Sequence, residues 1–481
     1  MFTDISFSND RPLYLQIRDY IKQMILKGLL SQGQKLPSTR ELSSILNVSR
    51  NTVILAYEYL QDEGFIEILK GKGTFVSAIN IDYQNQWEFD WNSKLNQYAK
   101  LANELDIVKH EAKWQKGMIS FKSIAPDDKL FDVEDFKRAF LNRFSLEGEK
   151  VLNYGYAQGY KPLIEYLLNY MSNKGVNIKG KDILITNGFT EGFDIVLSAL
   201  ANPGDYILCE NPTHNTAIKI MKLHSLNIVG VDIEEDGINL TQLEKVLSNR
   251  PISMGFLIPS YHNPTGIVMS PEKRMEVLKI FAQYRVPIIE DGFNEELRYS
   301  GSHLSPLAAL CGSGNSVLYI GSLSKVLFPG LRIGWILGDK DLISKLESVK
   351  RSRDIHTSFL DQAVLYEYLV TGNLEKYLKK ARRIYREKYD FALECAKKYI
   401  PHKRILGEGG LHIFVELDEN IDARLVLDEC IKRNVIFMPG DIFFTDGKGK
   451  NTFRLGFARS TLQEMEKGFN IIGEIIKEME E

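Results

Sequence analysis

The 481-residue chain is poor in cysteine, and its four cysteines are far apart. Cys209, Cys311, Cys395 and Cys430 form no CxxC pair. Zinc ribbons and disulfide-rich domains need closely spaced cysteines, so we expect neither of them and no metal site. Sparse cysteine use of this kind is typical of the reducing cytoplasm, where we expect this chain to be located.

The chain also lacks a long hydrophobic run. No stretch approaches the ~20 apolar residues that a membrane-spanning helix needs. Residues 1–10 contain two acidic side chains and no apolar core, so they do not resemble a secretory signal. We therefore expect no membrane partner.

The chain also has no large excess of positive or negative charge. The 60 Lys and Arg residues nearly balance the 63 Asp and Glu residues, which leaves a net charge of -3. Taken alone, this balance argues against a protein that binds nucleic acid through its overall positive charge. A balanced total can still conceal a basic part, so the charge of each part matters more than the sum.

Fixed-period repeats and low-complexity tracts are absent too, and the patterns along the chain indicate three unequal parts. Residues 1–78 hold short helical patterns and a glycine-rich hairpin. Residues 79–116 form a linker that contains Trp87, Trp91 and Trp114. Because flexible linkers are normally poor in aromatic residues, we expect this one to pack against a domain or wrap a partner. Residues 117–481 form the largest part.

The N-terminal part predicts three helices and a hairpin. Pro12 can begin the first helix, and Ser38 with Glu41 has the spacing of a capping box before the second. Ser49 can cap the third helix and leave the next three residues exposed in its first turn. Residues 66–76 read as two strands around a Gly-Lys-Gly turn. This order is typical of a winged helix-turn-helix, although helix-turn-helix spacing alone also occurs in proteins that do not bind DNA.

Several phrases carry a resemblance to a known family, namely Pro12-Leu-Tyr-Leu-Gln-Ile17, Lys35-Leu-Pro-Ser-Thr-Arg-Glu-Leu42, Val48-Ser-Arg-Asn-Thr-Val53 and Gly71-Lys-Gly-Thr-Phe75. Through them, residues 11–76 resemble the complete winged helix of GntR-type regulators. The resemblance implies a double-stranded DNA operator as partner. It assigns the DNA contacts to Arg40, Ser49, Arg50, Asn51, Thr52, Lys72 and Gly73.

From residue 117 onward, apolar stretches of strand length alternate with helical patterns. Four such stretches are 182–186, 206–209, 286–289 and 317–320. This alternation favours an α/β domain with a sheet buried on both faces. The residues from about 355 to 481 predict a smaller α+β subdomain.

A lysine follows the stretch 317–320 in the motif Ser322-Leu-Ser-Lys325, and Arg332 comes seven residues later. A lysine at a strand exit can form a Schiff base with pyridoxal 5'-phosphate (PLP). The hydroxyls of Ser322 and Ser324 and the guanidinium of Arg332 suit the phosphate group. Standing alone, the same motif is more typical of a surface lysine in a serine-rich loop.

Three further motifs strengthen the PLP interpretation. Asp291 ends a predicted strand and can pair with the pyridine nitrogen, and Asn263 can donate to the phenolic oxygen. Gly188, Phe189 and Thr190 open a helix after a strand, where backbone N–H groups can bind phosphate. Each motif is weak alone, since an aspartate often caps a helix and Asn-Pro-Thr-Gly is a common turn. In this order and together they indicate a PLP site.

With these motifs, residues 117–481 resemble class I aminotransferases of PLP fold type I. The resemblance implies that Tyr154 reaches the phosphate of the neighbouring subunit and that His214 stacks on the pyridine ring. It assigns a ligand carboxylate to Arg454, with Arg459 as the alternative. Phe293 is a departure, because related regulators tend to carry a Tyr there whose hydroxyl helps set the cofactor's electronics. Its loss should alter the aldimine pKa and blunt catalysis, whereas cofactor binding should survive.

The fusion of these two parts resembles MocR/GabR-type transcription regulators. It implies a PLP-dependent regulator in which Lys325 holds PLP as an internal aldimine and an amino compound, or PLP itself, is the signal. It also implies a homodimer, with domain swapping of the winged helices as one arrangement. The alternative is an active aminotransferase with a secondary DNA-binding domain, since the lysine that would shuttle protons is present.

The charge of the N-terminal part bears on how strongly it binds DNA. Residues 1–78 carry nine Lys and Arg residues against eight Asp and Glu residues, so this part is only about +1. We expect weak non-specific affinity for one winged helix and a need for two on one operator.

Overall fold

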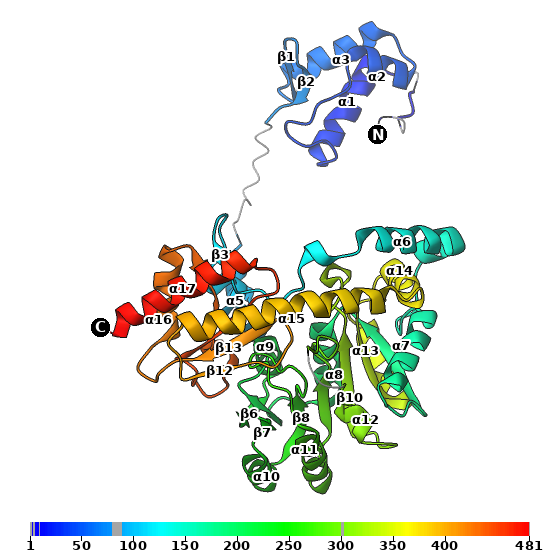
Figure 1. Ribbon diagram of the computed structural model, residues 1–481. Coiled ribbons are helices and arrows are strands. Elements are labelled where there is room, and N and C mark those ends of the chain that lie inside the picture. Colours follow the sequence, from blue (N-terminus) through cyan, green and yellow to red (C-terminus); the bar gives the residue numbers. More distant parts are fainter. Residues whose placement is uncertain (1, 3–4, 9, 79–88, 300–302, 481) are drawn as a thin grey trace. The chain divides into compact units, whose positions relative to one another are not determined.

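The computed structural model describes residues 2, 5–8, 10–78, 89–299 and 303–480. It divides the chain into two compact units, Met1–Lys94 and Leu95–Glu481 (Figure 1). Across the described residues, no helix combines the length and apolarity needed to cross a bilayer. Multidomain organisation with an α/β second part is therefore confirmed.

The first unit is a three-helix bundle with an antiparallel hairpin. Its elements are α1 (Leu13–Leu26), α2 (Thr39–Leu46), α3 (Arg50–Asp62), β1 (Ile66–Leu69) and β2 (Gly73–Val76). The predicted capping box is present, since Ser38 Oγ accepts from the Glu41 N–H and the Glu41 carboxylate accepts from the Ser38 N–H. Ile17, Val53 and Tyr57 are buried where the helices meet. The unit is a winged helix-turn-helix, as predicted.

The stretch that follows the first unit belongs partly to the second. After the short helix η1 (Trp91–Lys94), α4 (Gln97–Glu104) packs on α9 (Asn215–Leu223), and α5 (Ile107–His110) follows. Trp91 and Trp114 are 75% and 57% exposed, so neither of them is buried in this chain. Trp87 lies outside the described residues.

A mixed sheet forms the centre of the second unit, and the described residues give it eight strands in the order β4-β11-β10-β9-β8-β5-β6-β7. β5, β6, β8, β9 and β10 run parallel, whereas β4, β7 and β11 pair antiparallel. The strands are β4 (Lys181–Thr186), β5 (Tyr206–Asn211), β6 (Asn227–Glu234), β7 (Gly237–Ile238), β8 (Ile252–Leu257), β9 (Ile288–Asp291), β10 (Val317–Ser322) and β11 (Gly334–Asp339).

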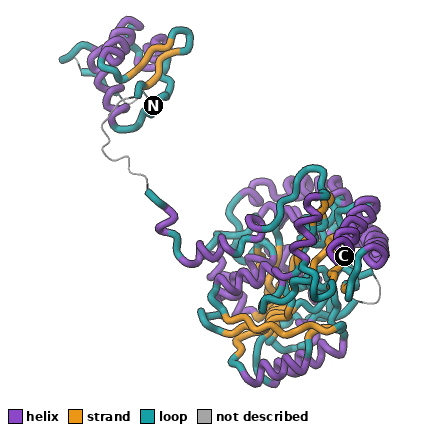
Figure 2. The backbone as a smooth tube through the Cα atoms, turned by 90° about the vertical axis from the view of Figure 1, so that its left-hand side faces the viewer, coloured by secondary structure: helices purple, strands orange, loops and turns teal. Residues whose placement is uncertain are grey.

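Helices cover both faces of this sheet, with the strands running between them in Figure 2. Along β10, Val317 and Tyr319 enter one hydrophobic core, whereas Leu318 and Ile320 enter the other. This alternation follows from the two-residue period of a strand, and it explains why β10 is apolar throughout. The helices of this part are α7 (Lys161–Asn173), α8 (Phe189–Leu200), α9, α10 (Leu240–Asn249), α11 (Pro271–Gln283), α12 (Leu307–Leu310), α13 (Lys340–Arg351) and α14 (Phe359–Val370), and α6 (Val133–Glu147) packs on α14.

The C-terminal part forms a smaller α+β layer around its own core. A four-stranded sheet has the order β12-β13-β16-β15, and β14 pairs separately with β3 from the start of the unit. The long helix α15 joins this part to the larger one (Figure 1). The elements are β3 (Ile119–Ser120), α15 (Asn373–Tyr399), β12 (Arg404–Leu406), β13 (His412–Glu416), α16 (Ala423–Lys432), β14 (Val435–Ile436), β15 (Met438–Pro439), β16 (Thr452–Gly456) and α17 (Leu462–Glu480).

The capping box gives a test of the first unit. Replacing Ser38 by Ala removes the side chain that accepts from the Glu41 N–H, which should cost about 1 kcal/mol of the unit's stability. Amide hydrogen exchange of α2 and α3 in the full-length protein measures this loss. Ser44→Ala, an exposed change in the same helix, is the control. Equal exchange rates in the two variants would contradict the role given to Ser38.

Candidate functional site

A cavity of ≈ 280 Å³ opens where the parallel strands of the large sheet end. Asp291 ends β9, Ser322 ends β10, and His214 follows β5, and all three line the cavity. Ligands of open α/β sheets bind at the carboxyl ends of the strands, because the loops that leave the sheet converge there. This cavity is therefore the candidate site.

Lys325 enters the cavity from the loop after β10. Its removal from water and the nearby Arg454 and Arg332 lower the pKa of Lys325 to about 8. A larger share of the amine is consequently neutral near pH 7 than in a lysine exposed to water. A neutral amine is the form that acts as a nucleophile.

Asp291 is the acidic residue among those that line the cavity with Lys325. Burial and the neighbouring carboxylates of Glu295 and Glu290 raise the pKa of Asp291 well above its ordinary value. Burial therefore favours the protonated form of this carboxyl, and a basic ring nitrogen beside it would accept that proton.

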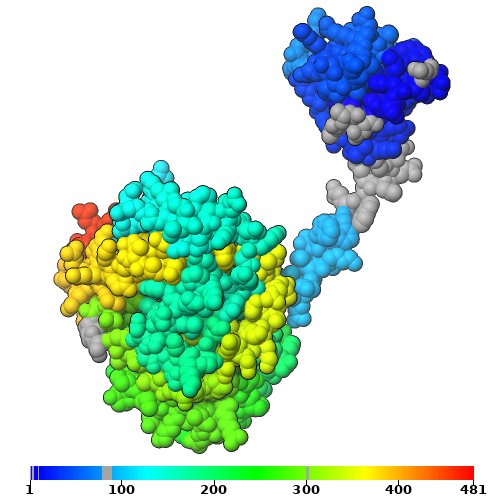
Figure 3. Space-filling model, turned by 90° about the vertical axis from the view of Figure 1, so that its right-hand side faces the viewer, coloured from blue at the N-terminus to red at the C-terminus, as the bar shows by residue number. Residues whose placement is uncertain are grey.

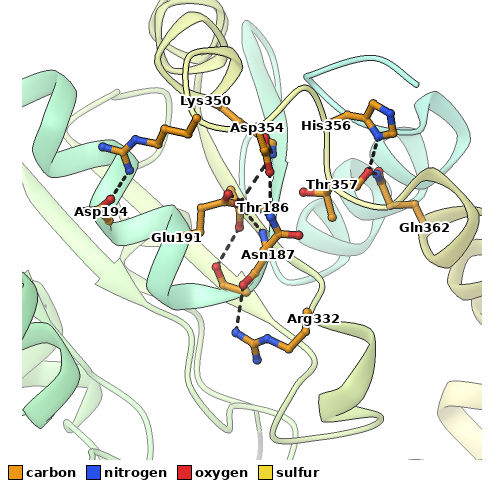
Figure 4. Close-up of polar contacts among 12 residues, drawn as sticks. Thr186, Asn187, Glu191, Asp194, Arg332, Lys350, Asp354, His356, Thr357 and Gln362 are labelled. Atoms are coloured by element: carbon orange, nitrogen blue, oxygen red, sulfur yellow. Dashed lines mark hydrogen bonds and ion pairs between the residues drawn. The ribbon is translucent and has the colours of Figure 1, made fainter. Parts of the chain in front are cut away.

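An anion cradle lies at the start of α8. Gly188 has a φ of +82°, and a Cβ built on it would approach Arg332 Nη2 to 2.8 Å, so only glycine fits without displacing the arginine. Arg332 donates to the Asn187 carbonyl at 3.0 Å (Figure 4). Thr190 lines the cavity in the first turn of α8, and the buried Ser324 Oγ has no hydrogen-bond partner among the described residues.

A partly buried network of polar side chains supports this cradle. The Asn187 side-chain amide donates to Glu191 at 3.0 Å and to Asp354 at 2.9 Å, and it lies between these two carboxylates in Figure 4. The fully buried Lys350 pairs with Asp354 at 2.5 Å. Since each member is paired, the loop that carries Gly188 has a defined position before any ligand binds.

Arg454 and Asn263 also line the cavity and contact each other. Arg454 Nη1 donates to Asn263 Oδ1 at 2.6 Å, and the guanidinium lies 4.9 Å from the centre of the Phe443 ring. Burial lowers the pKa of Arg454 to about 9, which still leaves it charged at neutral pH. Arg459 is exposed, donates to the Pro126 carbonyl and does not line the cavity. Of the two arginines considered for a carboxylate, the structure brings Arg454 into the cavity.

The remaining predicted site residues occupy different surroundings. His214 and Phe189 line the cavity with ring centres 5.4 Å apart, and burial lowers the pKa of His214 to about 3, so its ring is neutral. Phe293 also lines the cavity, where its ring lies 6.4 Å from that of His412. Tyr154 is 78% exposed and does not line its own chain's cavity.

Several cavity residues were not expected from the sequence, and Asn294 and Ile107 are two of them. Asn294 is 1% exposed, and neither atom of its side-chain amide has a partner among the described residues. Ile107 reaches the cavity from α5, far away in the sequence. Asn294 could have been noticed as the residue after Phe293, whereas no sequence signal pointed to Ile107.

A candidate DNA interface lies in the first unit. The exposed members of the predicted set gather at the start of α3 and at the hairpin turn, with one more in α2. They are Arg40, Ser49, Arg50, Asn51 and Lys72. Ser49 also caps α3, since its Oγ accepts from the Thr52 N–H at 3.1 Å. Gly73 has a φ of +118°, and a Cβ there would approach Lys35 Cε to 2.7 Å.

Comparison with known proteins matches both units to families. Residues 117–472 match the family described as aminotransferase class I and II, and residues 13–76 match the family of bacterial regulatory proteins named gntR. The Bacillus subtilis (strain 168) protein named "Uncharacterized HTH-type transcriptional regulator YisV" is 30% identical over 98% of both chains.

Two enzymes are similar to the second unit. Aromatic-amino-acid aminotransferase 1 of Thermococcus litoralis is 31% identical over 80% of this chain and 92% of its own. The crystal structure of LysN, an α-aminoadipate aminotransferase from Thermus thermophilus in complex with N-(5'-phosphopyridoxyl)-L-leucine, has a TM-score of 0.75. It is 29% identical and covers 81% of this chain and 99% of that chain.

These matches span both compact units, and they agree with the order of motifs predicted along the chain. The chain belongs to the aminotransferase class I and II family and carries a DNA-binding domain of the gntR family at its N-terminal end.

Proposed function

We propose that this protein is a PLP-dependent transcription regulator whose aminotransferase-like unit senses a small amino compound. The observation that carries the proposal is the cavity in which Lys325, Asp291 and Arg454 converge, in a chain that also has a gntR-family domain. DNA binding follows from that domain. The identity of the signal follows from the chemistry of the cavity.

The residues present fit PLP. The Ser324 hydroxyl, buried without a partner among the described residues, and the cradle of Gly188 and Arg332 offer donors to a phosphate. Asp291 offers a carboxyl to the pyridine nitrogen, and Asn263 offers an amide to the phenolic oxygen. The half-buried His214 ring is neutral and lines the cavity, as a residue that stacks on the pyridine should.

Each group of this chain has a distinct task. When bound, PLP supplies an aldehyde that condenses with primary amines. Lys325 would hold the cofactor through its neutral amine, which a second primary amine could displace. Asp291 keeps a proton at the ring nitrogen, and Arg454 holds a carboxylate of the incoming compound. The signal is thus an amine that also carries a carboxylate.

Regulation requires that this exchange change the DNA-bound state. An amine alters DNA affinity only if it binds two conformations of the protein with different affinity. The cavity lies between the large sheet and the C-terminal part, since Arg454 is on β16 and Lys325 follows β10. We infer that the large sheet and the C-terminal part close around the amine. This closure is the conformational change that alters DNA binding.

We also propose a homodimer. Tyr154 would complete the phosphate site of a second copy, because it is exposed and remote from its own cavity. It is one of several exposed apolar and aromatic side chains of α6 and the residues that follow, a segment coloured cyan to teal in Figure 3. The exposed side chains are Val133, Phe140, Leu141, Phe144, Leu146, Leu152, Tyr154 and Tyr156. A patch of this kind is typical of a subunit interface, and a dimer would present two winged helices to one operator.

Catalysis is the second candidate function, and the intact cavity favours it. Lys325, Asp291 and Asn263 are the groups that a transaminase needs for PLP, and the similar enzyme from Thermococcus litoralis is an aminotransferase. Phe293 argues for slow turnover, since it provides no hydroxyl to the cofactor. Sustained multiple turnover with amino donors and 2-oxo acids would establish an enzyme; a single spectral change without turnover favours a sensor.

The lowered pKa of Lys325 predicts how PLP attaches. After PLP has been removed and added back, the rate of attachment should rise with pH and reach half its maximum near pH 8, since only the neutral amine reacts. The absorbance of the attached cofactor measures the rate. Lys325→Ala should abolish this absorbance, whereas Lys161→Ala, at an exposed site, should retain it. A midpoint near that of an ordinary lysine would contradict the proposed environment.

The position of Arg454 in the cavity predicts which amines the protein binds. Arg454→Gln should weaken binding of carboxylate-bearing amines by about 100-fold, because a buried charged partner is lost, and should change the binding of amines without a carboxylate much less. Absorbance titration of the PLP-loaded protein measures both affinities. The matched change Arg459→Gln should leave them nearly unaltered, since Arg459 lies outside the cavity. Equal loss for both kinds of amine would reject the carboxylate assignment.

A further inference from the structure

One wall of the cavity comes from the segment that leads out of the first unit. Ile107, in α5, lines the same cavity as Lys325 and Arg454. We call residues 97–112 the strap; it contains α4 and α5 and precedes the region matched to aminotransferases. Ile107 therefore borders the proposed effector site, although in the sequence it lies between the DNA-binding unit and the aminotransferase-like region.

The strap is packed against the residues around Arg454. Ile107 contacts a small hydrophobic cluster of Phe414, Met438 and Phe443. Met438 lines the cavity, and the Arg454 guanidinium lies 4.9 Å from the centre of the Phe443 ring. Ile107 is consequently one layer of side chains away from the proposed carboxylate site.

A second, polar connection runs to the far end of the strap. Arg454 Nη2 donates to the Lys122 carbonyl at 3.3 Å, and Lys122 Nζ donates to the Ala112 carbonyl at 2.5 Å. Glu111 is buried and pairs with Arg424 at 2.9 Å. The strap is thus tied to the wall of the cavity by both apolar and polar contacts.

Ile107 also adjoins free space outside this cavity. A second cavity of ≈ 240 Å³ is bordered by Ile107, by Lys219 and Ile218 of α9, and by Ile442. Close packing normally resists the movement of a core side chain. Because the half-buried Ile107 borders two cavities, it has room to shift when a ligand fills the first one.

We propose that Ile107 is a specificity-determining residue that packs against the side chain of the bound amine, limits its size, and transmits its presence to the strap. The inference rests on the proposed sensing function. Ile107, Ile124, Phe293 and Met438 give the cavity an apolar side, whereas Arg454 and Lys325 supply its cationic groups. The ligand class that fits is a carboxylate-bearing amine with an apolar side chain.

Variants of Ile107 test this assignment in the full-length, PLP-loaded protein. The probes are glycine and the L and D forms of alanine, leucine and phenylalanine, with apparent affinity measured from cofactor absorbance. Ile107→Ala should lower the ratio of the Kd for phenylalanine to that for alanine by about tenfold, because it removes bulk from the wall. Ile107→Phe should raise the same ratio by about tenfold. Two opposite shifts separate an effect on the pocket from a general loss of folding.

The second readout is DNA binding. In wild type, the best probe amine should change the affinity for upstream DNA, and Ile107→Ala should reduce that change by about fivefold. Val108→Ala is the matched control, since Val108 is the next residue of α5 and is 75% exposed. It should retain both the wild-type size preference and the wild-type DNA response.

The outcomes separate the two proposals. If wild type responds to amines while both Ile107 variants keep its size preference and DNA response, the role of Ile107 is overturned and the sensing function stands. An altered size preference with an unaltered DNA response overturns transmission through the strap. If no amine changes the absorbance of wild type, the sensing function itself is rejected, and this inference with it.

Discussion

The structure depends on an excess of positive charge around one cavity, where Arg454 is buried, Lys325 is half-buried and Arg332 is exposed. Lys325, Arg332 and Arg454 converge there, and Asp291 is the acidic residue that lines the cavity with them. Charges held away from water are costly unless partners offset them, and the lowered pKa values of Lys325 and Arg454 express that cost. An anionic ligand offsets it. Two anionic groups, a phosphate near Arg332 and a carboxylate near Arg454, would satisfy both ends of the cavity.

The fold places these charges by ending several strands at the same edge. β9 delivers Asp291, β10 is followed by Lys325, and β4 leads to the glycine that keeps Arg332 in place. Arg454 comes from β16 in the C-terminal part, so the cavity is shared between two layers with separate cores. Relative movement of these layers therefore changes the distance between the phosphate end and the carboxylate end. Such a site is suited to sensing, because a ligand that contacts both layers binds most tightly at one distance between them.

Much of the site could be predicted because its signals are local. Lys325, Asp291 and Gly188 each follow an apolar stretch of strand length, and strand exits of a parallel sheet meet at one edge. The capping box at Ser38 is a local signal in the same sense.

The features that the sequence did not predict are set by distant contacts. Ile107 enters the cavity only because the strap packs against Met438 and Phe443, more than three hundred residues away in the chain. The side-chain amide of Asn294 is buried without a partner among the described residues, and this property is visible only in the folded chain. No periodicity or motif carries such information, because both features depend on tertiary packing.

The central claim is that one chain couples an amine site to a DNA site. Fluorescence anisotropy with DNA from the region upstream of the protein's own gene tests it directly, using the full-length PLP-loaded protein. The account predicts that an amine that alters the cofactor absorbance also changes the Kd for this DNA, by a factor of about 5 to 150. An unchanged Kd with every amine that alters the absorbance would contradict it.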